Sequence, residues 1–240
     1  MSILNDMMRD VLSLVAPASC PVCGKWLGRG EAVVCASCEV MAPLTNLWRE
    51  PHNPMNERFW GLMPVERASA FLWYVEGSAW RDVVHNFKYG GQWRVAYNMG
   101  RWFGAELRES GLYDDVDVVV PVPLHLARRM WRGYNQSEYI ARGIARELGV
   151  KVDVRSVSRH KYNSSQTHHS KDERWDNVEG IFRVRRADAL RGKHILLVDD
   201  VFTTGATIMS LGETILRSAE DVRLSVATLA TSRHSLHIKP

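Results

Sequence analysis

The sequence predicts an α/β domain with a mainly parallel sheet, preceded by a small N-terminal module. From residue 69 to residue 230, short apolar runs alternate with segments of helical periodicity, which is the pattern of parallel strands joined by helices. All four cysteines lie within residues 20–38, and this sets that part of the chain apart. With 45% hydrophobic and 24% charged residues, the chain of 240 residues has the composition of a globular protein with a buried core.

The first fifteen residues predict an amphipathic helix. Polar residues at positions 5, 6, 9 and 10 interrupt the apolar positions between Met1 and Val15, whereas a signal peptide has an unbroken apolar centre. No stretch of the chain approaches the roughly 20 apolar residues that cross a bilayer. We therefore expect a cytoplasmic protein with no membrane insertion.

The cysteines form two Cys-x-x-Cys pairs, Cys20 with Cys23 and Cys35 with Cys38. Each pair offers two thiolates about one turn apart, and two such pairs complete a tetrahedron around a zinc ion. Four protein ligands leave no open position for water, so we expect a structural rather than a catalytic metal. Disulfides are the alternative, but they fit poorly with a cytoplasmic chain and with the close spacing.

The chain after the second cysteine pair is expected to be a linker that wraps the surface. Four prolines recur between residues 43 and 64 in a stretch with little apolar periodicity. We place the domain boundary near residues 60–66. Residues 1–64 then comprise the N-terminal helix, the zinc module and the linker, and residues 65–240 form the second domain.

Periodicity and turn residues divide the second domain into expected strands and helices. The strands are expected at 69–75, 117–121, 152–158, 181–184, 194–199 and 222–230, and the helices at 78–88, 93–109, 135–148 and 205–218. We assign the aromatic residues of 93–109 to the core rather than to a base-stacking surface; they are Trp93, Tyr97, Trp102 and Phe103. Because ligands bind at the carboxyl ends of parallel strands, the segments that follow the strands are the first candidates for a site.

The strand that includes Val198 leads into the clearest candidate site. Asp199 and Asp200 follow an apolar run, and a small, hydroxyl-rich stretch from Thr203 to Thr207 then opens a helix. Main-chain amides and the dipole at a helix start bind anions, and adjacent carboxylates accept hydrogen bonds from the vicinal hydroxyls of a ribose. A capped helix after a strand is the alternative, but it leaves the paired acids unexplained.

This segment resembles the signature of type I phosphoribosyltransferases, in which an aliphatic run, two acids and two further residues precede Thr-Thr-Gly-x-Thr. The resemblance implies the fold of that family for the second domain. It also implies that Asp199 and Asp200 are the catalytic acids that hold the ribose hydroxyls of phosphoribosyl pyrophosphate, a substrate used with Mg²⁺. The 5′-phosphate is then expected on Thr203, Thr204, Gly205, Ala206 and Thr207.

Further segments of the sequence narrow the resemblance to one family among these proteins. They are Val120-Pro-Val-Pro-Leu-His125, Arg132-Gly-Tyr-Asn-Gln136, Phe87-Lys-Tyr-Gly90, Gln166, Glu173-Arg-Trp-Asp-Asn-Val178 and Gly180-Ile-Phe182. With the two cysteine pairs, they resemble the ComF (ComFC/GntX) family of phosphoribosyltransferase-like proteins. That family is linked to natural transformation, and the resemblance implies single-stranded DNA and a competence helicase as partners.

The loop after the strand at 117–121 carries Arg128, Arg129 and Arg132. Guanidinium groups suit multiply charged phosphate oxygens, and we assign these residues to pyrophosphate or a similar anion. They belong to a basic segment, because residues 125–194 hold 16 Lys/Arg and eight Asp/Glu, a net charge of +8 in a chain of +4. Such a segment suits an anionic partner such as a nucleotide or nucleic acid, and a solvated, salt-bridged surface is the alternative.

Residues 158–177 resemble the mobile loop of the same family, which closes over the substrate in related transferases. The stretch is polar and has little apolar anchoring. Its candidate contacts are Gln166, Lys171 and Arg174. The threonine expected three positions before Gln166 is replaced by Asn163.

The sequence leaves open whether the site is catalytic. Purine-salvage transferases carry an aspartate at the position of Thr203, and an unactivated hydroxyl does not replace it as a base. One hypothesis is a binding module of the ComF type that serves DNA uptake. The other is a working phosphoribosyltransferase for nucleobase salvage or an unidentified acceptor, and a nucleotide site retained only as a relic is a third.

Overall fold

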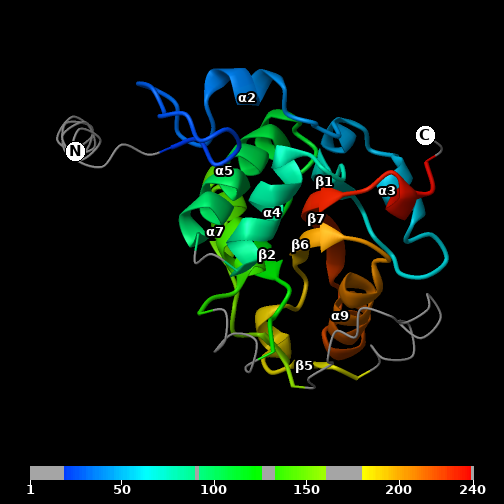
Figure 1. Ribbon diagram of the computed structural model, residues 1–240. Helices are drawn as coiled ribbons and strands as arrows, with labels where there is room; N and C mark the ends of the chain where they lie inside the picture. Colours follow the sequence, from blue (N-terminus) through cyan, green and yellow to red (C-terminus); the bar gives the residue numbers. More distant parts are fainter. Residues whose placement is uncertain (1–18, 90–91, 126–132, 161–179, 239–240) are drawn as a thin grey trace.

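A five-stranded parallel sheet with the strand order β1-β7-β6-β2-β3 forms the centre of the molecule (Figure 1). The computed structural model describes residues 19–89, 92–125, 133–160 and 180–238. The strands of the sheet are β1 (Ala68–Trp73), β2 (Val118–Pro121), β3 (Lys151–Val152), β6 (His194–Phe202) and β7 (Arg223–Thr231). The expected α/β architecture with parallel strands is confirmed.

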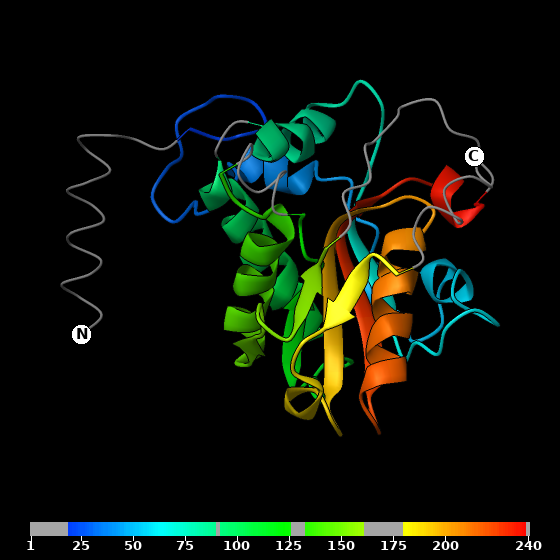
Figure 2. The same ribbon diagram turned by 90° about the horizontal axis from the view of Figure 1, so that it is seen from below.

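Helices cover both faces of this sheet (Figure 2). One face carries α4 (Ala79–Tyr89), α5 (Trp93–Glu109) and α7 (Gln136–Leu148), and the other carries α9 (Ala206–Ser218). The alternation of side chains along a strand produces the two cores. In β6, Leu196 and Val198 belong to the core under α5 and α7, whereas Ile195 and Leu197 belong to the core under α9.

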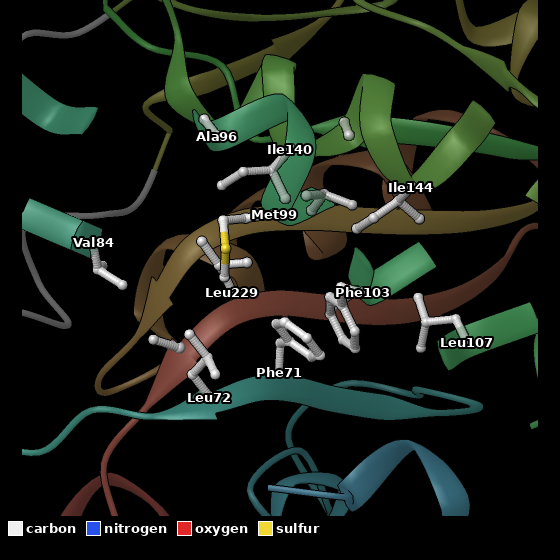
Figure 3. Packing of buried hydrophobic residues seen from close by; sticks show 14 of the residues in the cluster. Phe71, Leu72, Val84, Ala96, Met99, Phe103, Leu107, Ile140, Ile144 and Leu229 are labelled. Carbon is white, nitrogen blue, oxygen red and sulfur yellow. The ribbon is translucent and has the colours of Figure 1, made fainter. Parts of the chain in front are cut away.

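The first core is closed by direct contact between α5 and α7. Phe71, Met99, Phe103 and Ile140 meet between these helices and the sheet (Figure 3). Gly100 lies where the helices cross, and a Cβ added there would stand 2.9 Å from the Cα of Ile140. Close packing of the two helices therefore requires glycine at this position.

The aromatic residues of α5 differ in their burial. Phe103 is fully buried and Trp102 packs against the first core, so the assignment of these two residues to the core is confirmed. Tyr97 is half-buried, and its assignment to the core stays a prediction. Trp93 is 40% exposed, and its assignment to the core is wrong. It lies in the first turn of α5, where its ring packs beside that of Tyr139 at 5.2 Å.

The segment expected to be a surface linker contributes to both cores instead. Trp48, in a short 3-10 helix (Leu47–Arg49), is buried in the first core, and Met55 and Phe59, in and after α3 (Pro54–Glu57), are buried in the second. Asn53 holds this irregular backbone, because its side chain bonds to main-chain groups of Leu47, Glu50, Met55, Asn56 and Ala68. The linker interpretation is wrong because such a segment buries side chains without periodicity. The domain boundary near residue 64 stays a prediction.

The strand expected at 152–158 is two separate strands. β3 pairs with β2, whereas β4 (Val157–Arg159) pairs antiparallel with β5 (Phe182–Val184) in a second, two-stranded sheet. Asp153 makes the break, because its carboxylate accepts hydrogen bonds from the main-chain amides of Arg155 and Ser156 at 2.8 and 2.9 Å. These bonds close a turn that ends the first strand.

The predicted N-terminal helix at Met1–Val15 lies outside the described residues. Within the part of the chain that the structure describes, no helix is long and apolar enough to cross a membrane. The cytoplasmic location stays a prediction.

Candidate functional site

The connections of the sheet diverge between β2 and β6. The chain runs from β2 through α7 on one face to β3, and from β6 through α9 on the other face to β7. In open α/β sheets, ligands bind at such a point outside the carboxyl ends of the strands. A cavity of about 760 Å³ lies there, which is within the range of about 300–1,000 Å³ that is usual for ligand pockets.

β6 brings the two predicted acids to this cavity. Asp199 and Asp200 are half-buried and line it. They lie within β6 and not after its end, because β6 continues to Phe202, which pairs with Thr231 of β7. Asp199 Oδ1 accepts a hydrogen bond from the hydroxyl of Ser137 in α7 at 2.9 Å. This hydrogen bond connects Asp199 in β6 to α7, the helix that follows β2.

The loop from Thr203 to Thr207 lies beside these acids. Thr203 and Thr207 line the large cavity, and the whole loop surrounds a smaller one of about 30 Å³. Gly205 occupies the N-cap of α9 with a φ of 81°, a conformation that favours glycine. A Cβ at Gly205 would also stand 2.9 Å from the ring of Phe202. The close turn that presents the first amides of α9 to the cavity therefore depends on glycine.

The loop after β2 forms the opposite wall. The Val122 amide donates to the Val198 carbonyl at 2.8 Å, and the Val122 carbonyl accepts from the side-chain amide of Asn135 at 3.0 Å. Asn135 occupies the N-cap of α7 but makes no side-chain capping bond, and its side chain ties the loop to the helix instead. Outside the described residues lie the predicted anion-binding arginines and loop contacts: Arg128, Arg129, Arg132, Gln166, Lys171 and Arg174.

The ends of two further strands contribute residues that the sequence analysis missed. Tyr74 follows β1, Ser232 and His234 follow β7, and all three line the large cavity. Glu76 and His85 line it as well. The position of each segment at the end of an expected strand was a usable signal, but the sequence does not reveal that β7 lies between β6 and β1 in the sheet.

A second cavity, of about 690 Å³, is lined by part of the basic segment. Arg155, Arg159, Arg185 and Arg186 line it together with Asp153. Arg159 also lines the first cavity. A basic surface therefore begins at the edge of the space that the paired acids line.

The four cysteines converge on one point in the N-terminal module. Their Sγ atoms all lie within 4.8 Å of one another, and all four cysteines are free. Burial raises the pKa of the Cys20 thiol, but hydrogen bonds from the main chain at Cys35, Cys23 and Val22 lower it to about 7. Burial and the neighbouring thiols raise the pKa of Cys38. Four sulfur atoms at this spacing fit the ligand set of a tetrahedral metal site.

Comparisons with known proteins agree with this architecture. Residues 135–237 match the phosphoribosyl transferase domain family. DNA utilization protein YhgH of Salmonella typhimurium is 31% identical over 140 residues, which span 57% of this chain and only 60% of that protein. The protein of the same name from Escherichia coli is 26% identical over 85% of this chain and 93% of that protein. Competence protein ComFC of Bacillus subtilis is 27% identical over 93% of this chain and 82% of that protein.

The domain match includes α7, both acids of β6, the loop from Thr203 to Thr207 and the whole of β7. With the parallel sheet, it establishes the type I phosphoribosyltransferase fold. The match to ComFC covers nearly the whole chain and therefore extends beyond this domain toward the N-terminus. These matches, together with the cysteine cluster, support the assignment of the chain to the ComF family of phosphoribosyltransferase-like proteins.

Proposed function

We propose that the large cavity binds phosphoribosyl pyrophosphate or the ribose phosphate of a nucleotide. The observation that carries this proposal is that two adjacent acids and a tight loop at a helix start line one cavity. Asp199 and Asp200 accept hydrogen bonds from the ribose hydroxyls. The amides and hydroxyls of Thr203–Thr207 bind the 5′-phosphate, as helix starts commonly do.

In this proposal, Mg²⁺ binds together with the pyrophosphate group of the substrate. Mg²⁺ binds through one or two carboxylates together with substrate phosphates, and Asp199 and Asp200 supply carboxylates at the cavity wall. When bound, the ion neutralises charge on the pyrophosphate. The remaining protein contacts of the proposal are Arg128, Arg129 and Arg132 for the pyrophosphate and Gln166, Lys171 and Arg174 for a closing loop.

Thermal stabilisation by ligand tests this proposal. A ligand at 100 times its Kd stabilises the folded state by about 2.7 kcal/mol, so phosphoribosyl pyrophosphate with Mg²⁺ is expected to raise the Tm. The double substitution Asp199→Asn/Asp200→Asn weakens hydrogen bonds worth about 1.5–3 kcal/mol each, and we expect a Kd at least ~100-fold higher. Asp188→Asn is the matched control, because its carboxylate is 95% exposed and does not line the cavity. A wild-type Tm that the ligand leaves unchanged contradicts the proposal.

We propose that the cysteine cluster holds a structural zinc ion. Sulfur atoms within 4.8 Å of one another suit a tetrahedron with Zn–S bonds of about 2.3 Å. Removal of the metal by a chelator is expected to unfold the module and to expose the segment between Cys20 and Cys38 to proteolysis. Metal analysis of the pure protein is expected to find one zinc per chain. Protein without metal, in which thiol titration finds disulfides, overturns this assignment.

A second candidate function is the handling of DNA. The relatives named above are a DNA utilization protein and a competence protein, and the arginines of the second cavity form a basic surface beside the first. We propose that this surface binds single-stranded DNA and that a competence helicase is a partner, as the family resemblance implies. Such binding weakens with salt, because phosphate contacts release counterions.

Fluorescence anisotropy with a single-stranded oligonucleotide tests this second function. In Arg155→Ala/Arg185→Ala/Arg186→Ala, the slope of log K against log salt is expected to fall by about 0.7 for each DNA phosphate that the variant no longer binds. Arg217→Ala is the control, because its guanidinium pairs with Glu213 within α9 at 3.1 Å. Equal slopes in the triple variant and the wild type argue against DNA binding at this surface.

A further inference from the structure

Phosphoribosyl transfer to a neutral acceptor through its N–H group needs a base that takes the proton, and Thr203 is no base. The strand order indicates where such a group must lie. The acids of β6 stand in the middle of the cavity, the loop after β2 lies on one side, and the ends of β7 and β1 lie on the other. In a displacement at the ribose carbon, the acceptor enters opposite the leaving pyrophosphate, which the proposed function places on the β2 side. The acceptor then belongs on the β7 side.

His234 lies on that side, close to the position where a base is missing. β6 and β7 pair as far as Phe202 and Thr231, and the Thr231 hydroxyl donates to the Phe202 carbonyl at 3.3 Å. Thr203 and Ser232 therefore directly follow the last paired residues of two neighbouring strands. His234 follows two residues after Ser232 and lines the cavity.

The turn that carries His234 is fixed at both ends. The Ser235 amide donates to the Ser232 hydroxyl at 3.0 Å, and the Arg233 guanidinium lies 5.3 Å from the centre of the Trp73 ring. The His234 imidazole is exposed. Within the part of the chain that the structure describes, it has no hydrogen-bonding or ion-pair partner. The backbone is thus held in place while the ring can meet a ligand.

We propose, on the basis of the proposed ribose-phosphate site, that His234 accepts the proton of a neutral heterocyclic acceptor that carries an N–H group. The electron pair of the acceptor nitrogen forms the bond to the anomeric carbon. The bond between this carbon and the pyrophosphate oxygen breaks, and its electron pair leaves with the pyrophosphate. The proton of the N–H group passes to the imidazole. Tyr74 and Val84 line the same cavity and offer an aromatic and an aliphatic surface to a planar ring.

Glu76 and His85 are the alternative bases, and the strand order disfavours them. Both follow β1, which is separated from β6 by β7, whereas His234 follows β7 itself. His85 lines the cavity and serves as one comparison. His237 serves as another, because its Nδ1 lies 3.0 Å from a guanidinium nitrogen of Arg58 and it does not line the cavity.

Release of pyrophosphate from phosphoribosyl pyrophosphate with Mg²⁺ tests the proposal, with adenine, hypoxanthine, uracil and cytosine as acceptor probes. A general base contributes about 10²–10⁴-fold, so kcat is expected to fall at least ~100-fold in His234→Ala. The Kd for phosphoribosyl pyrophosphate, measured by calorimetry, is expected to stay within about twofold of the wild-type value, because the interaction that is removed acts only in the transition state. Added imidazole is expected to restore part of the missing kcat. In His237→Ala, kcat is expected to stay within about threefold of wild type. His85 lines the cavity, and we expect His85→Ala to lower kcat less than His234→Ala does.

Three results overturn the role of His234. They are an unchanged kcat in His234→Ala, a loss of kcat confined to His85→Ala, and binding of phosphoribosyl pyrophosphate without pyrophosphate release for every probe. Each of them leaves the ribose-phosphate site standing. A wild-type protein that does not bind phosphoribosyl pyrophosphate instead overturns the site itself and this proposal with it. Circular dichroism shows whether each variant is folded, and the exposed position of His234 favours intact folding.

Discussion

The two ends of the central sheet use charged residues in opposite ways. At the amino-terminal end of β6, His194 is fully buried, with Nδ1 3.2 Å from the Asp115 carboxylate and Nε2 2.8 Å from the Ser225 hydroxyl. The same carboxylate accepts hydrogen bonds from Arg67 and Arg223 at 3.2 and 2.8 Å. At this end, the charge of Asp115 is therefore paired with the charges of Arg67 and Arg223.

At the carboxyl end, the acids stand at the wall of a cavity instead. Asp199 and Asp200 are adjacent in sequence, and both line a space of about 760 Å³. Placing two carboxylates together costs stability unless a ligand or a cation uses them. The comparison indicates that the amino-terminal end serves the stability of the fold, whereas the carboxyl end is arranged for a ligand. The following changes test this difference, beginning with the largest expected effect.

Matched glycine substitutions at the two ends are expected to differ in their effect on binding. Gly205→Ala combines a left-handed backbone with a contact of 2.9 Å to the Phe202 ring, and we expect a loss of about 3 kcal/mol in the free energy of unfolding. Gly192, before β6, also has a positive φ, but a Cβ there meets no atom within 4 Å, so Gly192→Ala is expected to cost only about 1 kcal/mol. Only Gly205→Ala is expected to abolish stabilisation by phosphoribosyl pyrophosphate. Urea unfolding and calorimetry measure both, and equal effects of the two substitutions on binding would speak against the comparison.

Single acid-to-amide changes at the two ends are expected to have opposite consequences. Asp115→Asn weakens charged hydrogen bonds to two arginines, and because the carboxylate is 41% exposed we expect a loss of only about 1–2 kcal/mol in the free energy of unfolding. Its Kd for phosphoribosyl pyrophosphate should match the wild-type value. Asp200→Asn is expected to leave stability unchanged or higher and to raise that Kd. A destabilised Asp200→Asn with normal binding is the contrary outcome.

The buried histidine makes stability depend on pH through the amino-terminal end. Burial lowers the pKa of His194, against the opposing effect of Asp115. The unfolded chain therefore takes up the proton first as the pH falls below about 6.5. The stability due to neutral His194 is present above that pH and is lost as the pH falls through the folded-state pKa, with a slope of at most about 1.4 kcal/mol per pH unit. We expect His194→Gln to reduce the difference in unfolding free energy between pH 7.5 and pH 5.5, measured in urea. If this difference in unfolding free energy is the same in His194→Gln and in the wild type, a group other than His194 causes the pH dependence.

At lower pH, protonation of Asp115 reduces the free energy of unfolding further. Burial opposes its ionisation, but the hydrogen bond from Arg223 and the charges of His194 and Arg67 hold the pKa of this carboxyl below its usual range. Its contribution is therefore present above about pH 3.9 and is lost below that pH. Asp115→Asn is expected to remove this second phase and, because Asp115 raises the pKa of His194, to enlarge the first.

The parts of the site that are contiguous in sequence were predictable. Asp199, Asp200 and the residues from Thr203 to Thr207 follow one another, so that their composition alone indicates a strand, a tight turn and a helix start. The parallel sheet was predictable for a similar reason, because each buried strand is a short apolar run such as Val118–Pro121.

The residues that strand pairing brings together were not predictable. Tyr74 and His234 are 160 positions apart, and they reach one cavity because β1 and β7 are neighbours in the sheet. The burial of Met55 and Phe59 rests on hydrogen bonds of Asn53, which leave no periodic trace in the sequence. Local patterns thus indicate elements and loops, whereas the far wall of the site requires the strand order.

Hydrogen exchange on the wild-type chain, with and without phosphoribosyl pyrophosphate and Mg²⁺, tests the central claim most directly. The account predicts slower exchange of the amides at 203–208 after β6 and at 232–236 after β7. It predicts no change at residues 192–195 and 223–225, at the opposite end of the same strands. Slower exchange confined to the amino-terminal end, or none at either end, would contradict a ribose-phosphate site at the carboxyl end of the sheet.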